Sequence, residues 1–183
     1  MNLHAGVGAG GTVVRLVLDT NVVLDCFGFM DQHSAPIVRS LECGEAQLCS
    51  TPAIYEELLR VLDYPRLSLS IEARHRTRAR YEHLAFARAA AAIDEGAALR
   101  AGDEGHPPRC SLPSCSDVDD QKFLEAARDV RADFLITKDT ALLKISRARL
   151  RARLPFRILS PASFPAGGGL VHNFGEDRVG SPC

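Results

Sequence analysis

The sequence has no excess of either charge and no long apolar run. Its 22 Lys and Arg nearly balance its 23 Asp and Glu, so no overall electrostatic field recruits nucleic acid or a membrane, and such a partner must be met by a local patch. No apolar run approaches the length of a membrane span, and the first dozen residues lack the basic start and apolar stretch of a secretory signal. We therefore expect a cytoplasmic protein without a membrane partner.

Cysteine is present, but without the pairing that would give it a structural role. The six cysteines have scattered spacings with no CxxC pair, and a chain of 183 residues with 46% hydrophobic residues builds a core without disulfides. Reduced thiols are expected. His106, Cys110 and Cys115 suggest a zinc site, but a closed site needs four ligands and usually tighter pairing, so we favour ordinary loop cysteines.

Short β-rich runs alternate with longer runs of helical period, which predicts an α/β fold with a parallel sheet covered by helices on both faces. Helices are expected over residues 36–43 and 52–62, each with Pro near its start, over 71–95 as one or two helices, and from residue 116 onward. Residues 95–116 read as a long loop, with a possible short strand at 97–99. The predicted strands are residues 13–18, 46–50, 133–137 and 156–160.

The Gly-rich ends differ in composition from the rest of the chain. Residues 1–12 and 166–183 have the glycine content of flexible segments, which leaves residues 13–165 as a single folded domain. We find no internal repeat.

Acidic residues stand where the apolar pattern does not predict them. Asp19 directly follows the first predicted strand, and Asp139 follows the strand FLIT after one intervening residue. In a parallel sheet both project from the carboxyl edge, where such folds bind ligands. Two acids at one edge indicate a site.

Helical phase selects the other acids that can join them. At 100° per residue, Glu57 lies at the margin of its helix's apolar stripe, whereas Glu56 points nearly opposite. In the helix expected after Ser116, Asp120 lies on the buried face, Asp119 to one side and Asp117 at the opposite edge. Glu57 and Asp120 are therefore the inward acids.

Each acid also has a structural explanation, since Asp19 and Asp117 suit helix N-caps and a Glu at a stripe margin is usually solvated. Taken together, an inward Asp on a helix and two Asp at strand ends are harder to explain by capping. Clustered carboxylates drive one another toward protonation unless a cation compensates them. Ligands that are all oxygen favour Mg²⁺ or Mn²⁺ over zinc.

These residues resemble the PIN-domain ribonucleases. The resemblance rests on DTN (Asp19, Thr20, Asn21), the E-L pair after TPAIYE, the run DVDDQKFLEAA and the segment ITKD, and it covers residues 13–160. It implies a three-layer α/β/α sandwich with a central parallel sheet, and an acidic metal pocket that cuts RNA. The implied site residues are the metal ligands Asp19, Glu57, Asp120 and Asp139, the accessory acid Asp117, and the supporting Thr20, Asn21 and Thr137.

The form SDVDDQKFLEAA followed by a TxD strand and ALLK looks most like the toxins of toxin-antitoxin pairs. That likeness implies a small cognate antitoxin as a partner, and often a homodimer. Many relatives carry a further acid two residues after the TxD Asp, where this sequence has Ala141, so the number of metal ions stays open.

Two basic runs offer positive charge for a polyanion. In the run of residues 144–153, just after the Asp139 segment, Arg alternates with Ala or Leu, which suits phosphate contacts by Arg147, Arg149, Arg151 and Arg153 as well as a solvated helix face. For the run of residues 74–80 we favour the solvated face.

Two other functions compete with the metal-dependent nuclease. A receiver or phosphatase-like phosphoryl-transfer domain also gathers acids at strand ends, but it leaves Glu57 and Asp120 without duties. A non-catalytic PIN-like module would bind RNA or protein without cutting, although all four acids are present. No serine or histidine stands in the context of a catalytic triad or nucleophile elbow.

Overall fold

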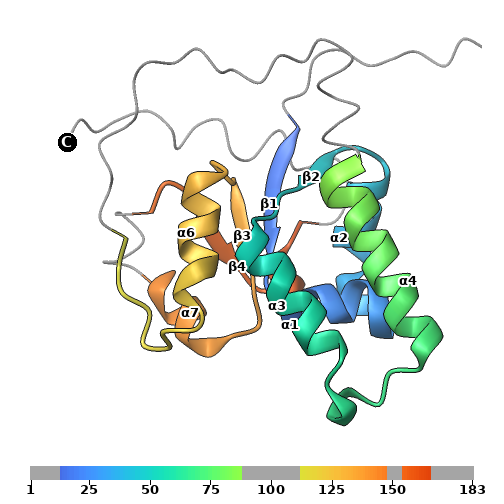
Figure 1. Ribbon diagram of the computed structural model, residues 1–183. Helices are drawn as coiled ribbons and strands as arrows, with labels where there is room; N and C mark the ends of the chain where they lie inside the picture. Colours follow the sequence, from blue (N-terminus) through green and yellow to red (C-terminus); the bar gives the residue numbers. More distant parts are fainter. Residues whose placement is uncertain (1–12, 88–111, 148–153, 166–183) are drawn as a thin grey trace, which may run out of the picture.

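The computed structural model describes residues 13–87, 112–147 and 154–165 (Figure 1). The four predicted strands are present as β1 (Val14–Leu18), β2 (Ala46–Leu48), β3 (Phe134–Ile136) and β4 (Arg157–Leu159), each one or two residues shorter than predicted. They form one parallel sheet in the order β2-β1-β3-β4. The predicted α/β class and parallel sheet are confirmed.

Helices cover both faces of this sheet, with α6 and α7 on one side of it and α2 and α4 on the other in Figure 1. The side chains of β1 alternate between two hydrophobic cores. Leu16 and Leu18 pack into the core that includes α2 and α4, whereas Val17 packs into the core that includes α6 and α7. Because β1 is buried on both faces, its sequence VRLVL is apolar almost throughout. The three-layer sandwich is therefore present.

The helices follow the strands in the expected alternation. On the first half of the chain they are α1 (Thr20–Val23), the π-helix η1 (Leu24–Phe29), η2 (Gln32–Ser34), α2 (Ala35–Glu42), α3 (Pro52–Leu62), η3 (Pro65–Leu67), α4 (Ile71–Glu82) and the π-helix η4 (His83–Ala87). On the second half they are α6 (Gln121–Asp129), α7 (Thr140–Ile145) and η6 (Pro161–Ser163). The helix expected over residues 71–95 is present as α4 and η4 up to Ala87.

The prediction that a helix begins at Ser116 is wrong, because α6 begins at Gln121. Two local hydrogen bonds explain why α6 begins five residues later than predicted. Asp117 Oδ1 accepts from the backbone N–H of Asp119 at 2.9 Å, and Gln121 Oε1 accepts from the N–H of Cys115 at 2.8 Å. Side chains that bond nearby backbone groups favour turns over helix, so the acidic segment forms the entry to α6.

Several sequence predictions lie outside the described residues. They are the flexible ends at 1–12 and 166–183, the strand at 97–99, most of the long loop, and the zinc candidates His106 and Cys110. No helix in the described parts of the chain is long and apolar enough to cross a membrane.

Candidate metal site at the carboxyl edge of the sheet

Asp19 directly follows β1 and caps α1. Its Oδ1 accepts a hydrogen bond from the N–H of Val22 at 2.9 Å, and its Oδ2 accepts from Thr137 Oγ1 and from the N–H of Lys138 at 3.1 Å. Burial raises the pKa of Asp19, and the Thr137 hydroxyl and nearby backbone N–H groups, including that of Asn21, oppose the rise. The buried carboxylate is therefore both a helix cap and part of a polar cluster.

Asp139 lies at the neighbouring strand end, after β3. Its Oδ1 accepts from the N–H groups of Ala141 at 2.6 Å and Leu142 at 3.0 Å, which caps α7. Its own N–H donates to Thr137 Oγ1 at 2.9 Å. Thr137 is fully buried, and its hydroxyl links Asp19 to Asp139. This is a position at which the sequence predicted a supporting residue.

Asp120 lies at the entry to α6 and joins this pair. Burial raises its pKa to about 6, with the charges of Asp139, Asp117 and Asp19 and a hydrogen bond with Asp139 adding to the effect. Asp120 is half-buried, whereas Asp117 and Asp119 are exposed. Carboxylates whose charges raise the pKa of Asp120 lie close enough to it to share a compensating charge.

Glu57 comes from α3 and faces α6. Its Oε1 accepts from the hydroxyl of buried Thr20 at 2.7 Å, and its Oε2 forms an ion pair with Lys122. The Glu57 side chain is 14% exposed, and Glu56 is exposed, as the helical phase predicts for these two positions. Glu57 Oε1 therefore has a hydrogen-bond donor within the protein, and Oε2 has an ion-pair partner but no hydrogen bond.

Three residues of this edge escaped the sequence reasoning. Lys122 binds Glu57, and Lys138 Nζ pairs with the buried Asp25 at 2.6 Å. The signal for Asp25 was an acid within the apolar run VVLDCFGF, which η1 buries on α4. No local pattern indicated the lysines, because their partners are distant in sequence. The side chain of Asn21, by contrast, is exposed, and only its backbone N–H bonds to Asp19.

The donor set fits a divalent cation. Its side chains are all carboxylates, and three Asp residues (Asp19, Asp120 and Asp139) are close enough to perturb one pKa, which is the charge imbalance that Mg²⁺ or Mn²⁺ relieves. Among the described residues, no three His, Cys, Asp or Glu side chains already have the arrangement of metal ligands. Asp19 and Asp139 each use Oδ1 to cap a helix, which fixes the orientation of both carboxylates.

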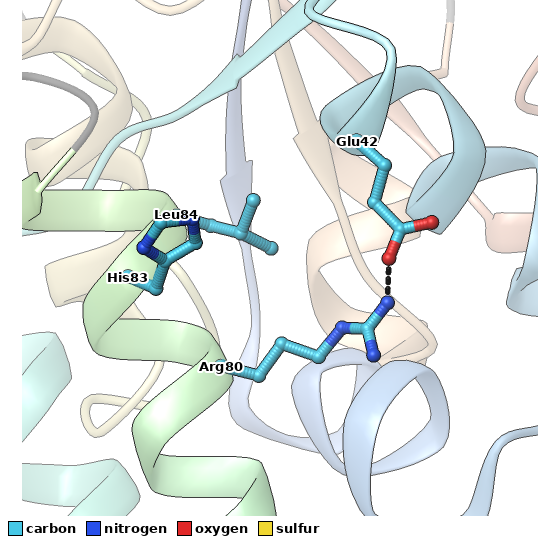
Figure 2. A pocket seen from close by; sticks show the side chains of 4 residues that line it. All are labelled: Glu42, Arg80, His83 and Leu84. Carbon is cyan, nitrogen blue, oxygen red and sulfur yellow. Dashed lines mark ion pairs between the residues drawn. The ribbon is translucent and has the colours of Figure 1, made fainter.

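A hollow of about 330 Å³ lies elsewhere, lined by Glu42, Arg80, His83 and Leu84 (Figure 2). An ion pair between Arg80 and Glu42 crosses it. Glu42 ends α2 shortly before β2 begins, so the hollow belongs to the amino end of the sheet and contains none of the predicted site acids.

Of the predicted RNA-contacting arginines, Arg147 is exposed after α7, and Arg149, Arg151 and Arg153 lie outside the described residues.

The fold is a three-layer α/β/α sandwich in which acids from several distant segments lie at the carboxyl edge of a parallel sheet, where such folds bind ligands. The sequence profile of the PIN domain matches residues 15–141, more than half of the chain, and the protein belongs to the PIN-domain family. PIN domains are generally nucleases. None of the curated proteins and none of the solved structures compared with this chain matches it.

Proposed function

We propose that this chain is a Mg²⁺- or Mn²⁺-dependent endoribonuclease that hydrolyses RNA phosphodiester bonds, and that it serves as the toxin of a type II toxin-antitoxin pair. The observation that carries the enzymatic part is that Asp139, Asp117 and Asp19 lie close enough to Asp120 at one sheet edge to raise its pKa, while the buried Thr137 hydroxyl links Asp19 to the N–H of Asp139. Membership in the PIN family favours nuclease chemistry over the receiver and phosphatase alternatives.

In this proposal, some residues bind the metal ion and others orient the metal ligands. Asp19, Asp120 and Asp139 would hold the ion, with Glu57 and Asp117 as the further predicted ligands. Thr137 orients Asp19, and Thr20 orients Glu57. When bound, Mg²⁺ or Mn²⁺ supplies charge neutralisation of the phosphodiester and orientation of the attacking water.

The toxin assignment rests on the run DVDDQKFLEAA and the TxD segment, which resemble the toxin branch of the family. A small antitoxin is the partner proposed with it, and a homodimer is the proposed assembly. Co-expression with the product of the adjacent reading frame tests this part. We expect that product to bind the chain and to suppress RNA cleavage, and a chain that cuts RNA equally in its presence would contradict the toxin role.

The test of the enzymatic part is single-turnover cleavage of a mixed RNA pool with Mn²⁺, using variants that first melt like the parent. Asp120→Asn should abolish cleavage, Asp117→Asn should reduce it, and the exposed Asp119→Asn should retain most of it. Asp119 is the matched control because it lies in the same turn and carries the same charge. A chain that binds RNA but never cuts it would instead be the non-catalytic module.

Millimolar Mn²⁺ should also raise the unfolding temperature of the parent, because a ligand of the native state stabilises it by mass action. Asp120→Asn should lose most of that rise. If Mn²⁺ leaves the melting curve of the parent unchanged, these acids do not form a working metal site.

A further inference from the structure

A lysine ammonium pairs with Glu57, one of the four acids predicted for the metal site. Lys122 is in the first turn of α6, two residues after Asp120, and its ammonium pairs with Glu57 Oε2 across the contact between α6 and α3. The ammonium also lies 5.6 Å from the ring centroid of the buried Phe123. Because Thr20 holds the other Glu57 oxygen, this lysine is anchored in one place.

The chain uses lysine sparingly, which makes this position informative. It has three lysines, Lys122, Lys138 and Lys144, among 22 Lys and Arg residues. Two of the three form ion pairs with carboxylates close to the acidic edge: Lys122 with Glu57, and Lys138 with Asp25. Lysine carries a compact point charge with three N–H donors, whereas arginine presents a planar fork.

The negative charge of Asp19, Asp120 and Asp139 repels an RNA phosphate that approaches them. A cation paired with the neighbouring Glu57 can offset this repulsion, whereas a solvated lysine far from the site cannot. The side chain of Lys122 is 25% exposed. The ion pair with Glu57 leaves the Lys122 ammonium with N–H donors for a second acceptor. Both the position and the hydrogen-bonding capacity of Lys122 therefore suit a phosphate oxygen at the mouth of the acidic cluster.

We propose that Lys122 contacts the scissile phosphate of RNA, and that Glu57 is the positioning residue that holds the Lys122 ammonium beside the three Asp carboxylates. This inference rests on the proposed nuclease function. It gives Glu57 a task that does not require it to be a metal ligand, and it places one protein cation at the reacting phosphate.

The experiment compares Lys122→Met, Lys122→Arg and Glu57→Gln with the parent, and uses Lys144→Met as a matched control that removes an exposed lysine from the last turn of α7. Three quantities are measured: the single-turnover cleavage rate at saturating Mn²⁺, the rise in melting temperature with Mn²⁺, and the salt dependence of RNA binding with Ca²⁺ in place of Mn²⁺. The RNA is a mixed-sequence single-stranded oligonucleotide.

Lys122→Met should slow cleavage by about 100–1,000-fold, the order of loss when one charge-stabilising donor is removed. It should also lower the slope of log K against log salt by about 0.7, the value for one phosphate on a single strand. The Mn²⁺-induced rise in melting temperature should persist, because a competing cation leaves the acidic edge. Lys122→Arg should keep the salt slope, Glu57→Gln should lose part of it, and Lys144→Met should cleave at the parental rate.

A parental rate and salt slope in Lys122→Met would overturn the inference. Loss of the Mn²⁺ response in that variant would also overturn it, since Lys122 would then only build the acidic site. If Lys122→Met fails to fold, Lys122→Gln takes its place in the same three measurements. A parent that never cleaves RNA with Mn²⁺ refutes the proposed nuclease, whereas the salt slope still decides whether Lys122 contacts phosphate.

Discussion

The hydroxyl of Thr137 donates a hydrogen bond to Asp19 across 118 residues of sequence, and so joins the ends of the two central strands. The same oxygen accepts from the N–H of Asp139 at 2.9 Å. One buried side chain thereby fixes the relative placement of two acids that the sequence could only assign to the same edge. The following predictions test this arrangement and its neighbours.

Thr137→Val should destabilise the fold by about 1–3 kcal/mol, because Asp19 loses a donor and the Asp139 N–H loses an acceptor in a buried place. Urea unfolding measures the loss. Thr77→Val is the control, since Thr77 is equally buried and its hydroxyl donates to the Ala73 carbonyl far from the acids. Only Thr137→Val should also reduce the Mn²⁺-induced rise in melting temperature, and an equal reduction in both variants would contradict the proposed role.

In the metal-free protein, the contribution of Asp120 to stability should fall as the pH rises from about 4 to about 6. The pKa of Asp120 is raised to about 6 from 3.8, so the folded state holds a proton that the unfolded chain has released. The contribution is fully present below the unfolded pKa and disappears as the pH passes the folded one. Asp120→Asn should remove this part of the pH dependence, and identical pH profiles for the two proteins would show that Asp120 titrates normally.

The ion pair between Lys138 and Asp25 should matter for stability. Asp25 is buried, and Lys138→Met leaves its carboxylate without the ammonium, at a cost of about 1–3 kcal/mol. The Lys138 side chain is 50% exposed, which keeps the cost below that of a fully buried pair. The double variant Asp25→Asn/Lys138→Met should be more stable than Lys138→Met alone, as measured in a double-mutant cycle. Additive losses would show that the two groups are not coupled.

Arg147, Arg149, Arg151 and Arg153 are predicted to contact RNA phosphates without sequence preference. Replacing two of them with Gln should weaken binding to all RNA sequences and flatten its salt dependence. Replacing Arg76 and Arg78 of α4, both exposed, is the matched control for loss of charge. A salt slope unchanged by the first pair would assign residues 147–153 to an ordinary solvated surface.

The sequence by itself determined the layered α/β class and the identity of the four strands, because a strand buried on both faces must be apolar almost throughout. It also placed Asp19 and Asp139 at one edge, since both come shortly after strands of a parallel sheet. The helical period of α3 also predicted that Glu57 lies at the margin of the buried face and that Glu56 points to solvent. These are local patterns, which can be read from the sequence without knowing which segments contact one another.

The tertiary structure alone decided which charges meet. The pairs of Lys122 with Glu57 and of Lys138 with Asp25 join segments that are distant in sequence, so no local period could show them. The helical pattern also did not predict where α6 begins. The side chains of Asp117 and Gln121 accept hydrogen bonds from nearby N–H groups and keep residues 116–120 out of the helix. Packing also brought Asp19 and Asp139 close enough to Asp120 to raise its pKa, because these distances depend on how α6 packs against the sheet.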